Sequence, residues 1–216
     1  MTEIGQAQSD KNYARTSPQK LAVLCILRAA KTIKDSENDT ELWFLAIPEL
    51  HRAVYSALVA ALSGTHGTGA FASKVQASWL EWLRGDWDKN NPPKSDRVDT
   101  FENLLKKAQR KTQEVVGDLM GEPLQLSAQE CSDLRKLNEF RDDIEHVKPT
   151  SWSLEVAGLP RIANSVVSVL RQLFKCSSIL MHLSEAESRA ADDAFKIIEE
   201  IATKHPSKSP KSWQPK

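Results

Sequence analysis

Apolar residues recur along this 216-residue chain at the three- and four-residue steps that are typical of amphipathic helices. Ser17 followed by Pro18 predicts the start of a helix that runs to about Lys34. That helix is apolar on nearly every side, which favours a central position in a bundle. A second helix contains Pro48, where it either begins or bends, and ends at 63–64. A third helix is anchored by four large apolar residues: Phe71, Val75, Trp79 and Trp82.

Two later segments carry the clearest bundle seams. Apolar positions alternate steps of three and four along residues 98–119 and again along residues 162–183. The second seam, which follows Pro160, fits a partner interface, but such a seam more often faces the protein's own core. Between the two, residues 152–156 alternate apolar and polar side chains, which predicts one short extended segment.

Capping signals predict where two further helices begin. Ser127 with Glu130, and Ser184 with Glu187, each have the spacing of a capping box, in which two free backbone amides are satisfied reciprocally. Pro149 predicts the end of the first of these helices, because the residue before a proline is disfavoured in helical conformation.

These elements predict an all-α fold, an antiparallel helical bundle with additional helices and at most one short extended segment. No internal repeat divides the sequence. We expect one helical domain over residues 16–203, flanked by a flexible N-terminus at 1–15 and a basic flexible tail at 204–216.

Charge changes this picture only locally. The 29 Lys and Arg residues balance the 29 Asp and Glu residues. The tail 204–216 holds four lysines and no acid, and residues 184–203 hold six acids and two bases, so residues 1–183 carry 23 of each sign. The even balance argues against a broad basic face of the kind that coats nucleic acid, but leaves a local RNA site open.

Composition indicates a soluble protein of the cytoplasm. Hydrophobic residues make up 40% and charged residues 27% of the chain, as in ordinary soluble proteins. The longest apolar run, residues 21–27, is too short to cross a bilayer, and the charged first twenty residues do not look like a signal peptide. The three cysteines, Cys25, Cys131 and Cys176, are too far apart to indicate a disulfide framework or a metal site.

The helix that begins after Ser127 ends in an Arg-x4-His motif, formed by Arg141 and His146, with Asp142 directly after the arginine. HEPN domains are helical bundles marked by Arg-x4–6-His, often with a polar residue after the Arg. Residues 140–146, 151–154 and 158–162, and earlier 46–51 and 61–65, resemble an uncharacterised bacterial HEPN-like group. The resemblance covers the middle of the chain in patches.

The resemblance implies a function in RNA cleavage. HEPN ribonucleases are dimers in which paired motifs form one composite cleft, and they need no metal or other cofactor. Members act as toxins or in phage defence, so an antitoxin or another protein is an expected partner besides RNA and a second copy. HEPN-type bundles also serve as non-catalytic modules that bind proteins or nucleotides, and this alternative stays open.

Five residues on a helix correspond to a rotation of about 140°, so Arg141 and His146 do not share a face. Two copies across a twofold axis bring one of each together. Histidine suits acid or base catalysis near neutral pH, and arginine suits developing phosphoryl charge. Asp142, one turn before His146, is expected to orient it. Alternatively, Arg141 forms a surface ion pair with Glu145, and His146 only complements the helix dipole.

Three further residues are expected to bind substrate. Asn138 extends the face of Asp142 by one turn, Lys148 lies in the mildly basic neighbourhood of the motif, and Arg161 lies near a helix start, which is a favourable place for a phosphate contact.

Other features point to structure rather than chemistry. The glycine-rich loop 64–69 lacks the Lys-Ser/Thr of a phosphate-binding loop and is interpreted as a connector. His51 has no second histidine at zinc-ligand spacing and is expected to pack beside Pro48. Trp79 and Trp82 could stack on bases, but their helical spacing favours the core.

Overall fold

The computed structural model describes residues 14–64, 67–85, 91–110, 122–146, 149 and 153–205. The described part of the chain is built from helices: α2 (Pro18–Asp35), η2 (Thr40–Leu42), α3 (Trp43–Leu62), α4 (Ser73–Arg84), α5 (Phe101–Ala108), α6 (Ala128–Glu145), η4 (Val156–Gly158), α7 (Leu159–Leu173), α8 (Ser177–Leu180) and α9 (Glu185–Lys204). Its one β-type pairing is an isolated bridge between Phe71 and Val98. The predicted all-α bundle is therefore confirmed.

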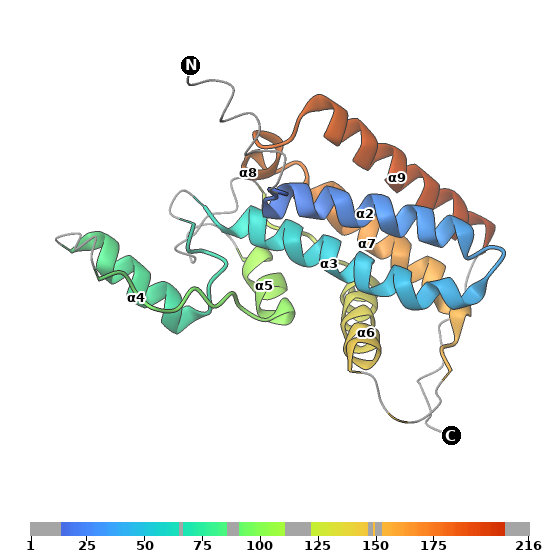
Figure 1. The fold of residues 1–216 in the computed structure, drawn as a ribbon, viewed down its shortest axis with the longest axis horizontal. Helices are drawn as coiled ribbons and strands as arrows, with labels where there is room; N and C mark the ends of the chain where they lie inside the picture. The colour runs from blue at the N-terminus through green and yellow to red at the C-terminus, as the bar shows by residue number, and fades with distance from the viewer. Residues whose placement is uncertain are drawn as a thin grey trace, which may run out of the picture.

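Helix α3 forms the centre of the bundle. It packs against α2, α5, α6 and α7, and α9 covers α2 and α7 on the other side (Figure 1). Thirteen of its twenty residues are buried, many of them alanines that allow neighbouring helices to approach closely. The stretch Thr40–Leu62 is long and apolar enough to cross a membrane, but 67% of its apolar window is buried in the fold. This burial is typical of the core helix of a soluble protein.

The predicted helix starts are confirmed. The Ser17 side chain accepts a hydrogen bond from the Lys20 backbone amide at 3.3 Å, with proline in the next position. Both capping boxes are present, at the starts of α6 and α9. Such caps depend on residues only three apart, so the sequence alone is sufficient to specify them.

Helix α3 begins at Trp43, five residues before Pro48, and continues through that proline. The Asp39 side chain accepts a hydrogen bond from the Glu41 amide at 3.0 Å and so caps η2, which leads directly into α3. The helix ends at Leu62, as predicted, and Gly64 follows with a φ of 60°.

Two predicted seams are longer than the helices that carry them. In the first, the helix within the described residues spans Phe101–Ala108. It begins there because the Thr100 side chain caps it by accepting from the Asn103 amide at 3.3 Å. Residues 111–121 lie outside the described part. In the second, α7 ends at Leu173 and Cys176 is extended before α8. Cys176 is nevertheless buried, so the apolar rhythm continues although the helix does not.

The predicted extended segment is not a β-strand in its described part. Residues 153–155 have no regular secondary structure, Glu155 has an extended backbone, and Val156–Gly158 is a short 3-10 helix that leads into α7. Residues 151 and 152 lie outside the described part, as do 1–13 and 206–216, which include most of the two predicted flexible ends.

Helix α4 projects to one side of the bundle (Figure 1). None of its residues is buried, so the expectation that Trp79 and Trp82 belong to the core is wrong. Their rings meet edge to face at 5.5 Å, and Trp79 Nε1 donates to the Ser95 carbonyl at 2.7 Å. The helical spacing of the tryptophans therefore builds a small local cluster against the returning segment 91–98.

A buried lysine fixes the base of this projecting arm. Lys107 Nζ on α5 donates to the Phe71 carbonyl at 2.6 Å and lies 3.0 Å from Asp99 Oδ2. Asp99 also accepts from the Asn103 side chain and from the Thr100 amide, and these bonds, with Lys107, hold its pKa below the usual range. Because Lys107 contacts two segments, it fixes the arm to α5, which in turn carries one wall of the site described next.

Candidate functional site: a pocket between α3, α5 and α6

A pocket of about 590 Å³ lies where α3 and α6 meet the start of α5. Residues of α6 that are three and four positions apart share one helical face, and that face supplies one wall of the pocket. The lining residues are His51, Arg52 and Tyr55 from α3, Thr100, Phe101 and Glu102 from the start of α5, and Asn138, Arg141, Asp142 and Glu145 from α6.

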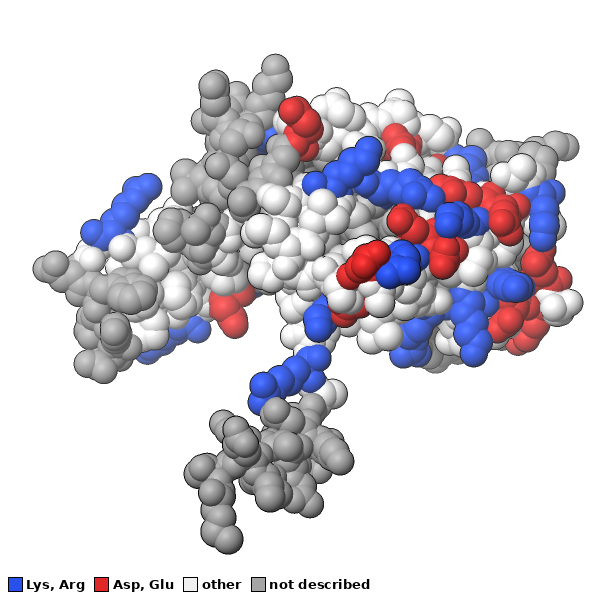
Figure 2. Space-filling view, turned by 90° about the horizontal axis from the view of Figure 1, so that it is seen from above, with Lys and Arg blue, Asp and Glu red and all other residues white. Residues whose placement is uncertain are grey.

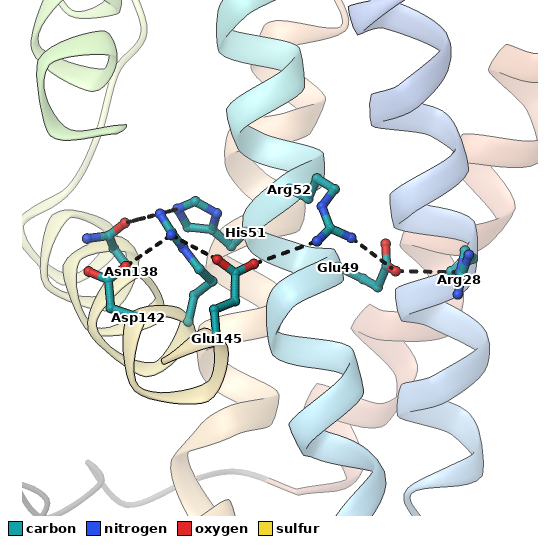
Figure 3. Close-up of polar contacts among 8 residues, drawn as sticks. Arg28, Glu49, His51, Arg52, Asn138, Asp142 and Glu145 are labelled. Atoms are coloured by element: carbon teal, nitrogen blue, oxygen red, sulfur yellow. Dashed lines mark hydrogen bonds and ion pairs between the residues drawn. The ribbon is translucent and has the colours of Figure 1, made fainter. Parts of the chain in front are cut away.

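Arg141 is in contact with four other pocket residues, His51, Asn138, Asp142 and Glu145, which are labelled in Figure 3. One terminal nitrogen, Nη1, lies 3.0 Å from Asp142 Oδ1 and 3.0 Å from Glu145 Oε2. The other, Nη2, lies 3.5 Å from both Asn138 Oδ1 and His51 Nε2. Its Nε is buried and has no hydrogen-bond partner within the described residues. The guanidinium is thus held at the pocket with one donor unused.

His51 faces Arg141 from α3. Its ring is 6% exposed, lies 4.5 Å from the Phe101 ring, and places Nε2 3.0 Å from Asn138 Oδ1. Burial, followed by the positive charge of Arg141, lowers the pKa of His51 to about 4. The imidazole is therefore neutral near pH 7 and retains one nitrogen lone pair that can accept a proton or a hydrogen bond.

Sequence reasoning assigned His51 no function and expected it to pack beside Pro48. It lies on α3 next to the buried positions Leu50 and Ala53, so it is a polar residue at the edge of an apolar stripe. A polar residue buried at such a position needs a polar partner inside the fold. A histidine at the edge of an apolar helical stripe is therefore the sequence signal that could have identified His51. The partner, Asn138, is 87 positions away and became identifiable only from the packing of α3 against α6.

His146, the histidine of the motif, does not line the pocket. It terminates α6, with φ −96° and ψ 74°, and its backbone amide bonds to the Asp142 carbonyl. Its side chain is exposed, while that of Arg141 is turned into the pocket. This confirms that the two residues do not share a helical face. The Asp142 carboxylate contacts Arg141 rather than orienting His146.

The predicted substrate-binding residues separate into three places. Asn138 lines the pocket, whereas Lys148 lies outside the described residues. Arg161 lies elsewhere, in an ion pair between its Nη1 and Asp133 Oδ1 at 2.6 Å. Asp133 is 2% exposed and also accepts from Ser165 Oγ at 2.8 Å. Arg161 therefore stabilises the α6–α7 contact and does not join Arg141.

The pocket is slightly acidic rather than basic. Two arginines and three carboxylates, on Glu102, Asp142 and Glu145, line it. The Arg141–Glu145 ion pair considered from sequence is present. Glu145 also pairs with Arg52 on α3, so a chain of ion pairs extends from α6 towards α2. Over the face seen in Figure 2, Lys and Arg side chains are interspersed with Asp and Glu. Bulk electrostatics will therefore contribute little to recruiting nucleic acid.

The described residues contain no group of three His, Cys, Asp or Glu side chains placed to hold a metal ion. The two buried thiols, Cys25 and Cys176, are also separate from the pocket lining. Burial raises the pKa of both, for Cys25 to about 12, so neither is a thiolate near neutral pH. The chemistry available at the pocket is that of its lining side chains, which comprise two arginines, three carboxylates, one imidazole, one amide and two hydroxyl groups.

Comparison with family models, with curated proteins and with solved structures finds no match to this chain.

Proposed function

We propose that this chain is a cytoplasmic, homodimeric HEPN-like protein that binds RNA at the pocket around Arg141 and cleaves it without a metal ion. One observation carries the proposal: the arginine of the Arg-x4-His motif is turned into a pocket, where a buried histidine nitrogen lies 3.5 Å from its guanidinium. The all-α bundle and the motif at the end of α6 agree with this interpretation.

The proposed reaction uses the ribose 2′-OH as nucleophile. A base removes its proton, the 2′-oxygen attacks the adjacent phosphorus, and an acid protonates the leaving 5′-oxygen. Arg141 stabilises the charge that develops on the phosphoryl oxygens. His51 is the proposed base because it lies in the pocket and is neutral near pH 7, although its lowered pKa makes it a weak one. His146, exposed at the end of α6, suits the role of acid towards the pocket of a second copy.

The reaction is tested with labelled single-stranded RNA in the presence of EDTA. Wild type should release products that end in 2′,3′-cyclic phosphate, and Arg141→Ala should cleave about 10²- to 10³-fold more slowly, the loss typical of removing one charge-stabilising donor. Arg135→Ala is the matched control, because Arg135 lies on α6 but is exposed and outside the pocket. Cleavage that survives in Arg141→Ala would refute the proposal.

The composite site is tested by mixing inactive variants. If His146 acts on the pocket of the second copy, Arg141→Ala and His146→Ala should each be inactive, and their mixture should regain activity because each mixed dimer contains one intact site. Mixing Arg141→Ala with His51→Gln should restore nothing, because both residues belong to the same protomer's pocket. Restoration in the second mixture, or its absence in the first, contradicts this arrangement.

A second function, a non-catalytic nucleotide- or protein-binding module, is favoured by one observation. Arg141 is already paired with two carboxylates, as a structural arginine would be. The two functions differ in cells: a toxin or phage-defence ribonuclease should slow growth and degrade RNA when overproduced, and Arg141→Ala should not. Wild type that leaves growth and total RNA intact, but is thermally stabilised by one nucleotide of a panel, would favour the binding module.

A further inference from the structure

Glu145 occupies a position between two arginines from different helices. Its Oε2 lies 3.0 Å from Arg141 Nη1 on α6, and its Oε1 lies 3.6 Å from Arg52 Nη2 on α3. Each carboxylate oxygen thus faces its own guanidinium (Figure 3). Two oxygens on a compact anion, each facing one arginine, are also what a phosphate group presents.

We infer that Arg52 and Arg141 form a phosphate clamp, and that Glu145 fills this clamp until a phosphate group displaces it. Both arginines line the pocket, and the buried Nε of Arg141 has no hydrogen-bond partner among the described residues. A donor without a partner is expected where a ligand completes a site. Arg52 was outside the site predicted from sequence, so the clamp adds a substrate-binding residue.

Glu145 is placed to leave the clamp. It is the last residue of α6, before the non-helical His146, and its side chain is 40% exposed. Ion pairs at such exposure contribute little to stability, so the carboxylate can swing into solvent at small cost. Arg52 then keeps Glu49 at 3.4 Å, which in turn faces Arg28 on α2 at 3.5 Å. Asp142 continues to orient Arg141.

The clamp explains why the pocket carries no excess of positive charge although it contains two arginines. With Glu145 in place, both cations are screened, and non-specific attraction of polyanions is weak. A phosphate that enters replaces one anion by another, so the cost of burying charge in the pocket is already met by the fold. The clamp rests on the proposed function in one respect: the proposed function identifies the phosphate group as a phosphodiester of single-stranded RNA. Free phosphate shares the same chemistry.

The test measures binding rather than cleavage. The probe is a fluorescently labelled single-stranded oligoribonucleotide in which every 2′-OH is replaced by 2′-fluoro, so that it cannot be cleaved. Inorganic phosphate is titrated separately by thermal shift. Glu145→Gln removes the competing charge and keeps the side-chain shape. Glu139→Gln is the matched control: Glu139 is also on α6 and in an i,i+3 ion pair, with Lys136, but outside the pocket.

Glu145→Gln should bind the oligonucleotide about tenfold more tightly than wild type at low salt. The slope of log affinity against log salt should steepen by about 0.7, the value for one more phosphate contact on a single strand. Glu139→Gln should match wild type. Adding Arg52→Gln to Glu145→Gln should abolish the gain.

If Glu145→Gln binds neither the oligonucleotide nor inorganic phosphate more tightly than Glu139→Gln does, the clamp is overturned, and a gain that survives Arg52→Gln would overturn it too. A gain seen only with inorganic phosphate would support the clamp and identify free phosphate as its ligand. Wild type that binds the oligonucleotide but cleaves no RNA would refute the proposed reaction alone. Circular dichroism of each variant checks that these exposed substitutions preserve the helices.

Discussion

Acidification should weaken the fold through His51, because this buried imidazole is neutral in the native protein and becomes charged on unfolding. Its pKa is about 4 in the folded state and about 6.5 in the unfolded state. The unfolded chain therefore binds the proton more tightly, and stability falls as the pH drops from about 6.5 towards 4. Between pH 7.5 and 5.0, linkage to this one group amounts to about 2 kcal/mol of lost stability.

The measurement is urea denaturation at pH 7.5 and at pH 5.0, followed by the circular dichroism of the helices. His51→Gln keeps a polar side chain next to Asn138 but cannot titrate. Its own free-energy difference between the two pH values should be about 2 kcal/mol smaller than that of wild type, whatever its absolute stability. Carboxyl groups with lowered pKa, such as Asp99 and Glu130, lose their contribution mainly below this range. An equal pH difference in wild type and His51→Gln would refute the burial and charge environment described for His51.

Three further changes test other parts of the structure. Asp133→Ala should cost about 3 kcal/mol or more in urea denaturation, because it leaves Arg161, whose Nε and Nη1 are buried, without its carboxylate partner. A loss below about 1 kcal/mol would contradict this. Ser127→Ala should lower the free energy of unfolding by about 1 kcal/mol, because it removes the α6 capping box. Ser132→Ala, at an exposed position of α6, should change it by less than about 0.5 kcal/mol, and equal effects of the two substitutions would refute the cap. Trp79→Ala should speed limited proteolysis of α4 while shifting global unfolding by less than about 1 kcal/mol, and a larger shift would mean that α4 belongs to the core.

The parts of the fold that the sequence predicts best are those fixed by neighbours in the chain. Both capping boxes and the proline-headed start of α2 depend on residues within three positions of each other. The apolar seams marked many buried residues, among them Phe101, Leu105 and Leu173, but they overstated helix length, and one seam position, Leu180, is 50% exposed. At Cys176 a buried side chain continues the rhythm across an extended residue, and periodicity alone cannot distinguish that from a helix.

The parts that the sequence missed depend on contacts between distant segments. Trp79 and Trp82 have the spacing of core residues, yet no bundle helix buries α4, and only the tertiary arrangement decides that. Within the site, Arg141 and Asn138 were identified from the motif on one helix. His51 and Arg52 come from α3, about 90 positions earlier, and no local pattern links them to α6.

The pocket is tested most directly by whether RNA reaches His51. Histidine side-chain ¹⁵N NMR spectra would be followed while the non-cleavable oligonucleotide is added. We expect the His51 ring signals to shift saturably in wild type and not to respond to RNA in Arg141→Ala. The signals of the exposed His182, outside the pocket, should stay unchanged in both. RNA that binds without moving the His51 signals, or that moves them equally in Arg141→Ala, would contradict the assignment of this pocket as the functional site.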